Sequence, residues 1–241
     1  MGELDEKQQV NFEAIKELGQ LGFLGMMTPE QYGGSALGAA AYVGVMIELS
    51  KVDAGTAVAV SVQNSLVNDT IAKWGTDEQK ATYLPKLATG EWIGCFSLTE
   101  GQAGSDPGSL MATATRDGDH FVLNGTKNFT TNGGIADVIF AFFQTDKNLG
   151  AKGVSAFLIP NTTSGFAVGK HENKLGIRTS STTEMVFSDC RVPASALLGT
   201  ENKGLNVALT TLDGGRIGIA AQALGIAQAA LEASVAYAKE R

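Results

Sequence analysis

Residues 1–91 carry apolar side chains at the spacing that is typical of amphipathic helices. The clearest repeat consists of Phe12, Ile15, Leu18 and Leu21. Two segments rich in Ala and Val follow at 39–50 and 56–74, and each is long enough for a helix. Thr28–Gln31 and Thr76–Gln79 both match the capping box that opens a helix. We therefore predict a helical N-terminal domain over residues 1–91.

From Trp92 onward the pattern changes to short apolar or alternating runs with tight turns between them. Asp117-Gly118 and Asn124-Gly125 have the composition of hairpin turns and flank the run His120–Leu123. Further strands are expected at 92–99, 111–115, 138–143, 154–159, 166–168 and 183–187. Many short strands with tight turns favour an antiparallel meander, sandwich or barrel over a sheet of strand–helix–strand units. We place this domain at residues 92–203.

The pattern returns to helix near Gly204 and stays helical to the last residue, Arg241. One apolar face is predicted to consist of Leu205, Leu209, Leu212, Ile219, Ala223, Ile226 and Ala230. Gly218 and Gly225 lie seven positions apart, and small residues at that spacing permit a second helix to approach closely. No stop signal closes the helix. We expect residues 204–241 to be the first helix of a C-terminal helical domain, and the chain to be truncated at both ends.

Composition narrows the classes of function. Of 241 residues, 44% are hydrophobic and 18% charged, as in globular proteins with a core. A net charge of −7 without a basic cluster argues against nucleic acid or an anionic membrane as a partner. No run approaches the ~18 apolar residues that span a bilayer, and no signal peptide is recognisable, so a cytoplasmic location is expected. Cys95 and Cys190 are expected to be buried thiols, and His120 and His171 lack the neighbours of a metal site.

The stretch with the most candidate chemistry is Phe96–Ser105, where an apolar strand passes into a glycine-containing loop. The end of such a strand presents a fixed row of backbone groups, which suits the pyrimidine edge of a flavin. Donors there stabilise the negative charge that appears on reduction. Thr99 adds a hydroxyl group, and Gly104-Ser105 permits the backbone to approach a phosphate. The alternative is an ordinary strand and turn.

Two further stretches have a structural and a functional interpretation. Leu123–Gly134 is either a plain hairpin or a segment in which Phe129 covers a planar ring and the Thr131 hydroxyl binds flavin N5. In the final helix, Arg216 follows two glycines, with Asp213 one turn earlier. These two charges form either a surface pair or a site for the polar tail of a ligand.

Together, these stretches resemble the acyl-CoA dehydrogenase family, in the same order along nearly all of the chain. The first resembles the family's "LTE…AGSD" signature and the second its "LNGTK.WITNGG" segment. Further similarities lie at Tyr32–Gly34, Trp74–Thr76, Lys174–Arg178 ("DKLGIR"), Asp189–Pro193 ("EDCRVP") and Thr211–Ala230, the last as in bacterial butyryl-CoA dehydrogenases. The resemblance implies an α+β multidomain fold, with an N-terminal helical bundle, a middle antiparallel β-barrel and the start of a C-terminal helical bundle.

The resemblance also implies a role for each matching residue. FAD would contact Phe96, Ser97, Leu98, Thr99, Glu100, Ala103, Gly104, Ser105, Phe129, Thr130 and Thr131. Acyl-CoA would contact Ser105, Asp213, Gly214, Gly215 and Arg216. The implied reaction is the α,β-dehydrogenation of a short-chain acyl-CoA in fatty acid β-oxidation, with hydride transfer to flavin N5. Complete family members form homotetramers and pass electrons to electron-transferring flavoprotein.

The chain departs from the family pattern at three site positions. Gly101 stands where the family usually has Pro, Phe129 where it has Trp and Thr130 where it has Ile. The first change loosens the loop, and the second is still compatible with stacking on a flavin. None of the three is expected to abolish the site.

The resemblance does not supply a catalytic base. The family's base is usually a Glu in a late "YEGT" segment, which is expected beyond Arg241, as is most of the "R..FG" segment that contacts a neighbouring subunit's FAD. Some relatives place the Glu where this chain has Gly215, which cannot abstract a proton. We therefore expect this chain to be catalytically inactive. The alternatives are a non-catalytic module that binds CoA, FAD or a partner, and a flavin oxidase or monooxygenase on the same scaffold.

Overall fold

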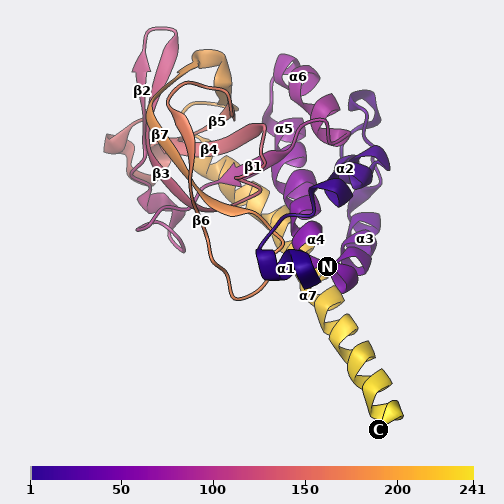
Figure 1. Cartoon of the computed structure of the whole chain (residues 1–241). Helices are drawn as coiled ribbons and strands as arrows, with labels where there is room; N and C mark the ends of the chain where they lie inside the picture. Colours follow the sequence, from indigo (N-terminus) through magenta and orange to yellow (C-terminus); the bar gives the residue numbers. More distant parts are fainter. Residues whose placement is uncertain (1) are drawn as a thin grey trace.

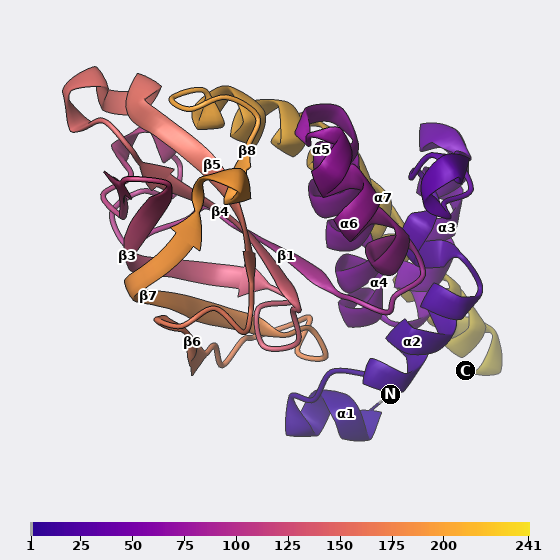
Figure 2. The same cartoon turned by 90° about the horizontal axis from the view of Figure 1, so that it is seen from above.

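The computed structural model describes residues 2–241. A layer of helices lies beside a curled β-sheet, and one long C-terminal helix runs past both (Figures 1 and 2). The helical layer consists of α1 (Gly2–Lys7), α2 (Phe12–Gln20), α3 (Gly38–Val52), α4 (Ala54–Ser61), α5 (Asp69–Trp74) and α6 (Asp77–Ala88). Ile15, Leu24, Met46 and Val60 are among the buried residues of its core.

Only one of the two predicted capping boxes forms. At α6, Thr76 Oγ1 accepts from the Gln79 backbone N–H at 3.1 Å, and Gln79 Oε1 accepts from the Thr76 N–H at 3.0 Å. The prediction at Thr28 is wrong, because the segment makes only a single 3-10 turn, Glu30–Tyr32, without a side-chain cap. The Thr28 hydroxyl is buried and accepts from Asn68 Nδ2 instead.

The predicted helical segment 56–74 is helical but changes its winding in the middle. Val62–Asn68, between α4 and α5, forms a π-helix, in which an extra residue per turn widens the coil. The polar side chains of this stretch point inward and are buried. Gln63 donates to the Leu87 carbonyl and accepts from the Gly94 N–H, each at 2.8 Å. The π-helix therefore joins the helical layer to the first strand.

The eight strands of the described residues are mostly antiparallel, as predicted. They are β1 (Gly94–Ser97), β2 (Thr113–Asp117), β3 (His120–Thr131), β4 (Val138–Gln144), β5 (Val154–Pro160), β6 (Phe166–His171), β7 (Thr182–Pro193) and β8 (Leu197–Leu198). They pair in the order β6-β7-β3-β2-β4-β5-β8. β1 runs parallel to β4, and β2 also meets β4 in parallel at one residue pair.

One of the two predicted hairpin turns is wrong. Asp117-Gly118 does connect β2 to β3, with Asp117 paired to His120. Asn124-Gly125 instead lies inside β3, at a shift of register against β7. Gly125 has φ +136°, and a Cβ there would lie 2.5 Å from the Ala112 Cβ. Two steps along β3 stand against three along β7 here, so the extra residue belongs to β7, where Asp189 has φ +47°. The dipeptide thus continues β3 opposite a bulge and does not make a turn.

The central strand β4 is buried on both faces. Phe140 and Phe142 pack with the helical layer, whereas Ile139 and Phe143 belong to the core inside the curled sheet. One face of the sheet thereby carries the helices, and the other face encloses a second apolar core. This arrangement places the ends of β1 and β3 next to the helices.

The long helix α7 (Gly204–Glu240) buries a different face from the one predicted. Its buried stripe consists mainly of small residues, whereas Leu209, Ile219 and Ile226 are exposed. A Cβ on Gly218 would lie 2.2 Å from the Tyr42 hydroxyl oxygen, and one on Gly225 would lie 2.3 Å from the Ile47 carbonyl. Close approach to α3 therefore requires the glycines, as their spacing predicted. By length and composition alone α7 could also cross a membrane, but its small-residue stripe packs on α3.

Candidate functional site

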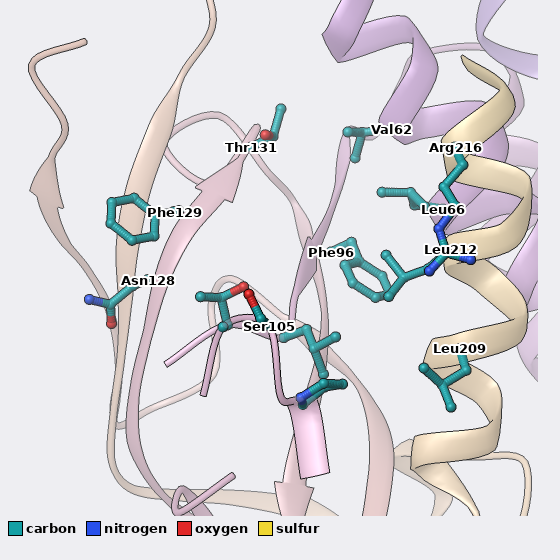
Figure 3. A pocket seen from close by; sticks show the side chains of 14 residues that line it. Val62, Leu66, Phe96, Ser105, Asn128, Phe129, Thr131, Leu209, Leu212 and Arg216 are labelled. Atoms are coloured by element: carbon teal, nitrogen blue, oxygen red, sulfur yellow. The ribbon is translucent and has the colours of Figure 1, made fainter. Parts of the chain in front are cut away.

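A cavity of about 450 Å³ lies between the ends of β1 and β3, the π-helix and α7 (Figure 3). Its lining comes from segments that are far apart in the sequence. They are Val62, Leu66, Phe96, Leu98, Thr99, Gly104, Ser105, Pro107, Asn128, Phe129, Thr131, Leu209, Leu212 and Arg216. The three stretches that the sequence singles out thus meet around one space.

Two hydrogen bonds join the first stretch to the second. The Asn128 N–H donates to the Thr99 carbonyl at 2.8 Å, and the hydroxyl groups of Ser97 and Thr130 lie 2.8 Å apart. Phe129 lies between these two links, where the pairing of β3 with β7 shifts. Its φ of +55° is unusual for an aromatic residue, and its side chain is 61% exposed. The neighbouring contacts therefore hold an aromatic ring open to the cavity in a strained backbone conformation.

The predicted site residues divide into a group that lines the cavity and a group behind it. Phe96, Leu98, Thr99, Gly104, Ser105, Phe129, Thr131 and Arg216 line it. Ser97 and Thr130 are buried behind this lining, as are Glu100 and Ala103. Asp213 lies at the surface, where its carboxylate pairs with Arg216. Gly214 and Gly215 belong to the same turns of α7.

A second, mostly apolar cavity of about 280 Å³ adjoins the first. It lies between α4 with the π-helix on one side and α7 on the other. Val62, Leu66, Leu212 and Arg216 line both cavities, so the two spaces are neighbours. Gly215 forms part of the wall, and a Cβ there would lie 2.7 Å from Leu66 Cδ2. The missing side chain of Gly215 thus leaves room for Leu66.

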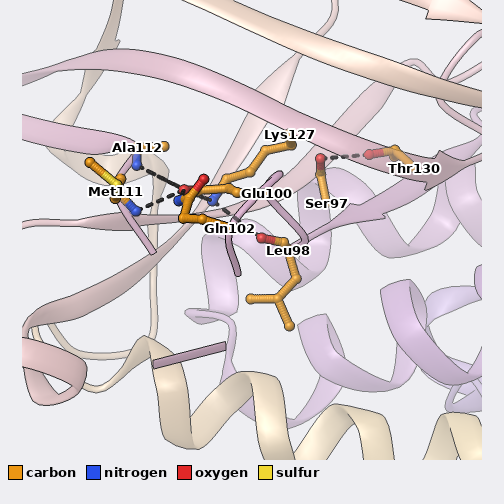
Figure 4. Close-up of polar contacts among 8 residues, drawn as sticks. All are labelled: Ser97, Leu98, Glu100, Gln102, Met111, Ala112, Lys127 and Thr130. Carbon is orange, nitrogen blue, oxygen red and sulfur yellow. Dashed lines mark hydrogen bonds and ion pairs between the residues drawn. The ribbon is translucent and has the colours of Figure 1, made fainter. Parts of the chain in front are cut away.

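Behind the cavity lies a buried ion pair that sequence analysis did not find (Figure 4). Lys127 Nζ lies 2.6 Å from Glu100 Oε1, and the two side chains are 0% and 4% exposed. Burial lowers the pKa of Lys127 to about 8, although the neighbouring carboxylate opposes this shift. Burial would raise the pKa of Glu100, but Lys127 and the hydrogen bonds outweigh it and lower that pKa. The sequence offered one signal for this pair, which is a lysine, Lys127, in the middle of a segment of β-forming residues.

The charges around the cavity limit its chemistry. Among the residues that line the two cavities in the described chain, Arg216 is the charged one, and none is Asp or Glu. Arg216 can bind an anionic group of a ligand. The hydroxyl groups of Thr99, Ser105 and Thr131 can donate or accept hydrogen bonds. The lining therefore suits a planar, hydrogen-bonding ligand with an anionic part, but it supplies no carboxylate for proton abstraction.

The chain matches three domain models of one protein family. Residues 1–91 match the acyl-CoA dehydrogenase N-terminal domain, residues 95–190 its middle domain and residues 202–241 its C-terminal domain. Among curated proteins, the chain is 49% identical to the short-chain specific acyl-CoA dehydrogenase of Clostridium acetobutylicum, covering 99% of this chain and 63% of that protein. It is 46% identical to the human mitochondrial short-chain enzyme, covering 99% of this chain and 58% of that one.

Solved structures give the same result. The butyryl-CoA dehydrogenase of Megasphaera elsdenii is 46% identical with a TM-score of 0.97, and the match covers 99% of this chain and 63% of that one. A solved structure described as the electron transferring flavoprotein of Acidaminococcus fermentans contains a chain that is 47% identical, with a TM-score of 0.97. That match covers 99% of this chain and 63% of that one. A glutaryl-CoA dehydrogenase of Mycobacterium smegmatis in complex with FADH2 has 42% identity and a TM-score of 0.91, over 98% of this chain and 60% of that one.

This chain spans less than two thirds of the length of these relatives. Within that span, the helical layer, the mostly antiparallel sheet and the start of the long helix all correspond. The chain belongs to the acyl-CoA dehydrogenase family.

Proposed function

We propose that this chain forms the flavin-binding surface of a short-chain acyl-CoA dehydrogenase, with FAD in the cavity between β1, β3 and α7. The observation that carries the proposal is the meeting of Thr99, Ser105, Phe129 and Thr131 around one space. The two arms of the site are Leu98–Ser105, which follows β1, and Asn128–Thr131, which ends β3. Both supply polar backbone or hydroxyl groups, and the second arm carries the exposed ring of Phe129. These groups fit a planar ring that has a hydrogen-bonding edge and a phosphate tail.

The residues present define what the protein would contribute. Bound FAD would supply the hydride acceptor for oxidation of the Cα–Cβ bond of an acyl-CoA thioester. Phe129 would cover the ring, Thr131 would donate near the ring nitrogen that receives hydride, and Thr99 would lie at the pyrimidine edge. Ser105 would bind phosphate or substrate, because glycine precedes it and leaves the backbone accessible. Glu100, Ser97, Ala103 and Thr130 would support these groups from behind.

The substrate would lie along α7. Arg216, with Asp213 and the two glycines between them, would hold the polar part of the acyl-CoA at the mouth of the cavity. The adjoining apolar cavity of about 280 Å³ would take a short acyl chain. The whole protein would be a cytoplasmic homotetramer that acts in β-oxidation and passes electrons to an electron-transferring flavoprotein, and the name of one similar solved structure supports that last partner. We propose these properties for the whole protein, with domains at 1–91, 92–203 and 204–241.

We expect this chain to bind FAD, and Phe129→Ala to weaken that binding by about tenfold. The reason is that an aromatic ring stacked on another contributes roughly 0.5–1.5 kcal/mol beyond the area that it buries. Titration with FAD, followed by flavin fluorescence, measures the dissociation constant. Tyr237→Ala is the matched control, because this ring is similarly exposed, 60% against 61%, but lies on the far part of α7. Equal affinities in both variants would contradict the placement of the ring.

We expect this 241-residue chain, loaded with FAD and mixed with butyryl-CoA, to show no rapid bleaching of the flavin absorption band. No carboxylate lines the cavities of the described chain, so the α-proton of the thioester has no acceptor there. A short-chain acyl-CoA dehydrogenase of full length is the positive control. The same observation favours a second candidate function, a non-catalytic surface that binds FAD or CoA. Fast bleaching would rule out that candidate and would contradict our expectation.

A further inference from the structure

The buried pair Glu100–Lys127 does not line the cavity, but each partner is next to residues that do. Glu100 directly follows Leu98 and Thr99, and Lys127 directly precedes Asn128 and Phe129. The pair therefore joins the two arms of the proposed flavin site at one level. The Asn128–Thr99 hydrogen bond joins them at the next level and the Ser97–Thr130 contact at a third. Phe129, with its positive φ, lies among these links.

The pair also connects the site to two more segments (Figure 4). The Glu100 carboxylate accepts from the backbone N–H of Met111 at 2.7 Å, from that of Ala112 at 3.2 Å and from Gln102 Nε2 at 2.6 Å. Lys127 Nζ also donates to the Leu98 carbonyl at 3.4 Å and lies 5.1 Å from the centre of the Phe143 ring. The carboxylate and the ammonium group thus have partners in several directions. These partners fix the backbone at Glu100 relative to the backbone at Lys127.

Such a pair is a poor device for stability alone. Moving both charges out of water is costly, and apolar side chains of the same volume often stabilise a core equally well or better. Charge-assisted hydrogen bonds, by contrast, are short and directional, so they fix geometry better than apolar contacts do. Here the fixed geometry is that of Leu98–Thr99 relative to Asn128–Phe129.

We propose that the Glu100–Lys127 ion pair is a positioning device for the flavin site, which sets the spacing and register between the end of β1 and the bulged end of β3. The pair acts through Thr99 and Phe129 and does not touch the ligand. The inference rests on the proposed function, because it assigns the cavity to FAD. It predicts that affinity for FAD depends on the pair separately from the stability of the fold.

The test measures FAD affinity and thermal stability in three variants of the whole chain: Lys127→Met, Glu100→Gln, and the two combined. All titrations are made at a temperature where circular dichroism shows each variant folded. We expect Lys127→Met to raise the FAD dissociation constant at least tenfold. The double variant removes both charges, so its melting temperature is expected to return toward that of the unsubstituted chain while its affinity for FAD remains at least fivefold weaker.

Ile159→Ala is the matched control, because this side chain is fully buried in the core inside the sheet and lines neither cavity. It lowers stability without altering the two arms, and its FAD dissociation constant is expected to stay within twofold of the original. A double variant that regains both stability and affinity would overturn the proposal and leave the pair a purely structural one. Failure of the unsubstituted chain to bind FAD would instead contradict the proposed function.

Discussion

Lys127→Met lowers the free energy of unfolding of this chain by about 3–5 kcal/mol, which is the expected result of leaving one partner of a buried pair without its counter-charge. The Glu100 carboxylate would remain 4% exposed, with backbone and Gln102 donors but without a cation. Urea unfolding followed by circular dichroism at pH 7 gives the value. Lys73→Met is the control, since its ion pair with Asp69 lies at the surface, with side chains 55% and 23% exposed, and is expected to contribute about 0–1 kcal/mol.

The loss in Lys127→Met is expected to shrink as the pH falls. In the unsubstituted chain the pKa of Glu100 is lowered, so this group contributes stability above its ordinary pKa of 4.5, and the contribution is lost as the pH falls through the lower, folded value. In the variant, burial without Lys127 raises that pKa, and protonation in acid relieves the unpaired charge. A difference that stays constant from pH 7 to pH 4 would contradict this account.

At high pH the titration of Lys127 acts in the unsubstituted chain. The folded pKa of Lys127 is about 8 and lies below the ordinary 10.5, so the stability that this group contributes increases as the pH rises between these values.

Gly218→Ala and Gly225→Ala are each expected to lower the free energy of unfolding by about 1–3 kcal/mol, which is typical of an overfilled core. The new methyl group would lie 2.2 Å from the Tyr42 hydroxyl oxygen in the first case and 2.3 Å from the Ile47 carbonyl in the second. The first change also disturbs the 2.7 Å hydrogen bond between Tyr42 and Ser61. Denaturant unfolding of each variant provides the measurement.

Gly214→Ala is the matched control for these two changes in α7. A Cβ at this position meets its nearest neighbour, the Ser65 carbonyl, at 3.9 Å, which is an ordinary contact. Alanine is favoured over glycine inside a helix by about 0.8–1 kcal/mol, so this variant is expected to be more stable than the original chain. If all three substitutions changed the free energy of unfolding in the same direction, the packing of α7 on α3 would not require glycine.

The sequence predicted local structure well where one short segment decides it. The capping box at Thr76 and the turn at Asp117-Gly118 need only neighbouring residues, and both form. Asn124-Gly125 has the composition of a turn, but its role depends on β7, whose pairing with β3 shifts there. Its place inside a strand is therefore decided by a strand more than fifty residues later in the chain, β7 at Thr182–Pro193, which carries the bulge opposite it.

The same distinction explains the errors at α7 and at the site. Leu and Ile make up most of the apolar face that was predicted for α7, but contact with α3 is close enough that only small side chains fit between the two helices. The cavity itself was predictable because its residues lie in recognisable segments, and the structure brings Thr99, Phe129 and Arg216 to it. Lys127 was missed because a strand pattern does not show that a lysine faces inward, where its partner Glu100 lies 27 residues away in sequence.

The π-helix at Val62–Asn68 constrains how the length of this segment can change during evolution. Each residue added to or removed from a helix turns everything beyond it by about 100°, because one turn takes 3.6 residues. Gln63 donates to the Leu87 carbonyl near the start of the π-helix, and Asn68 donates to the Leu24 carbonyl at its end. A deletion between Gln63 and Asn68 would rotate one of these side chains relative to the other, so one of them would lose its partner. We therefore expect homologous chains to vary in length at the surface segment Lys147–Gly153 far more readily than within these seven residues.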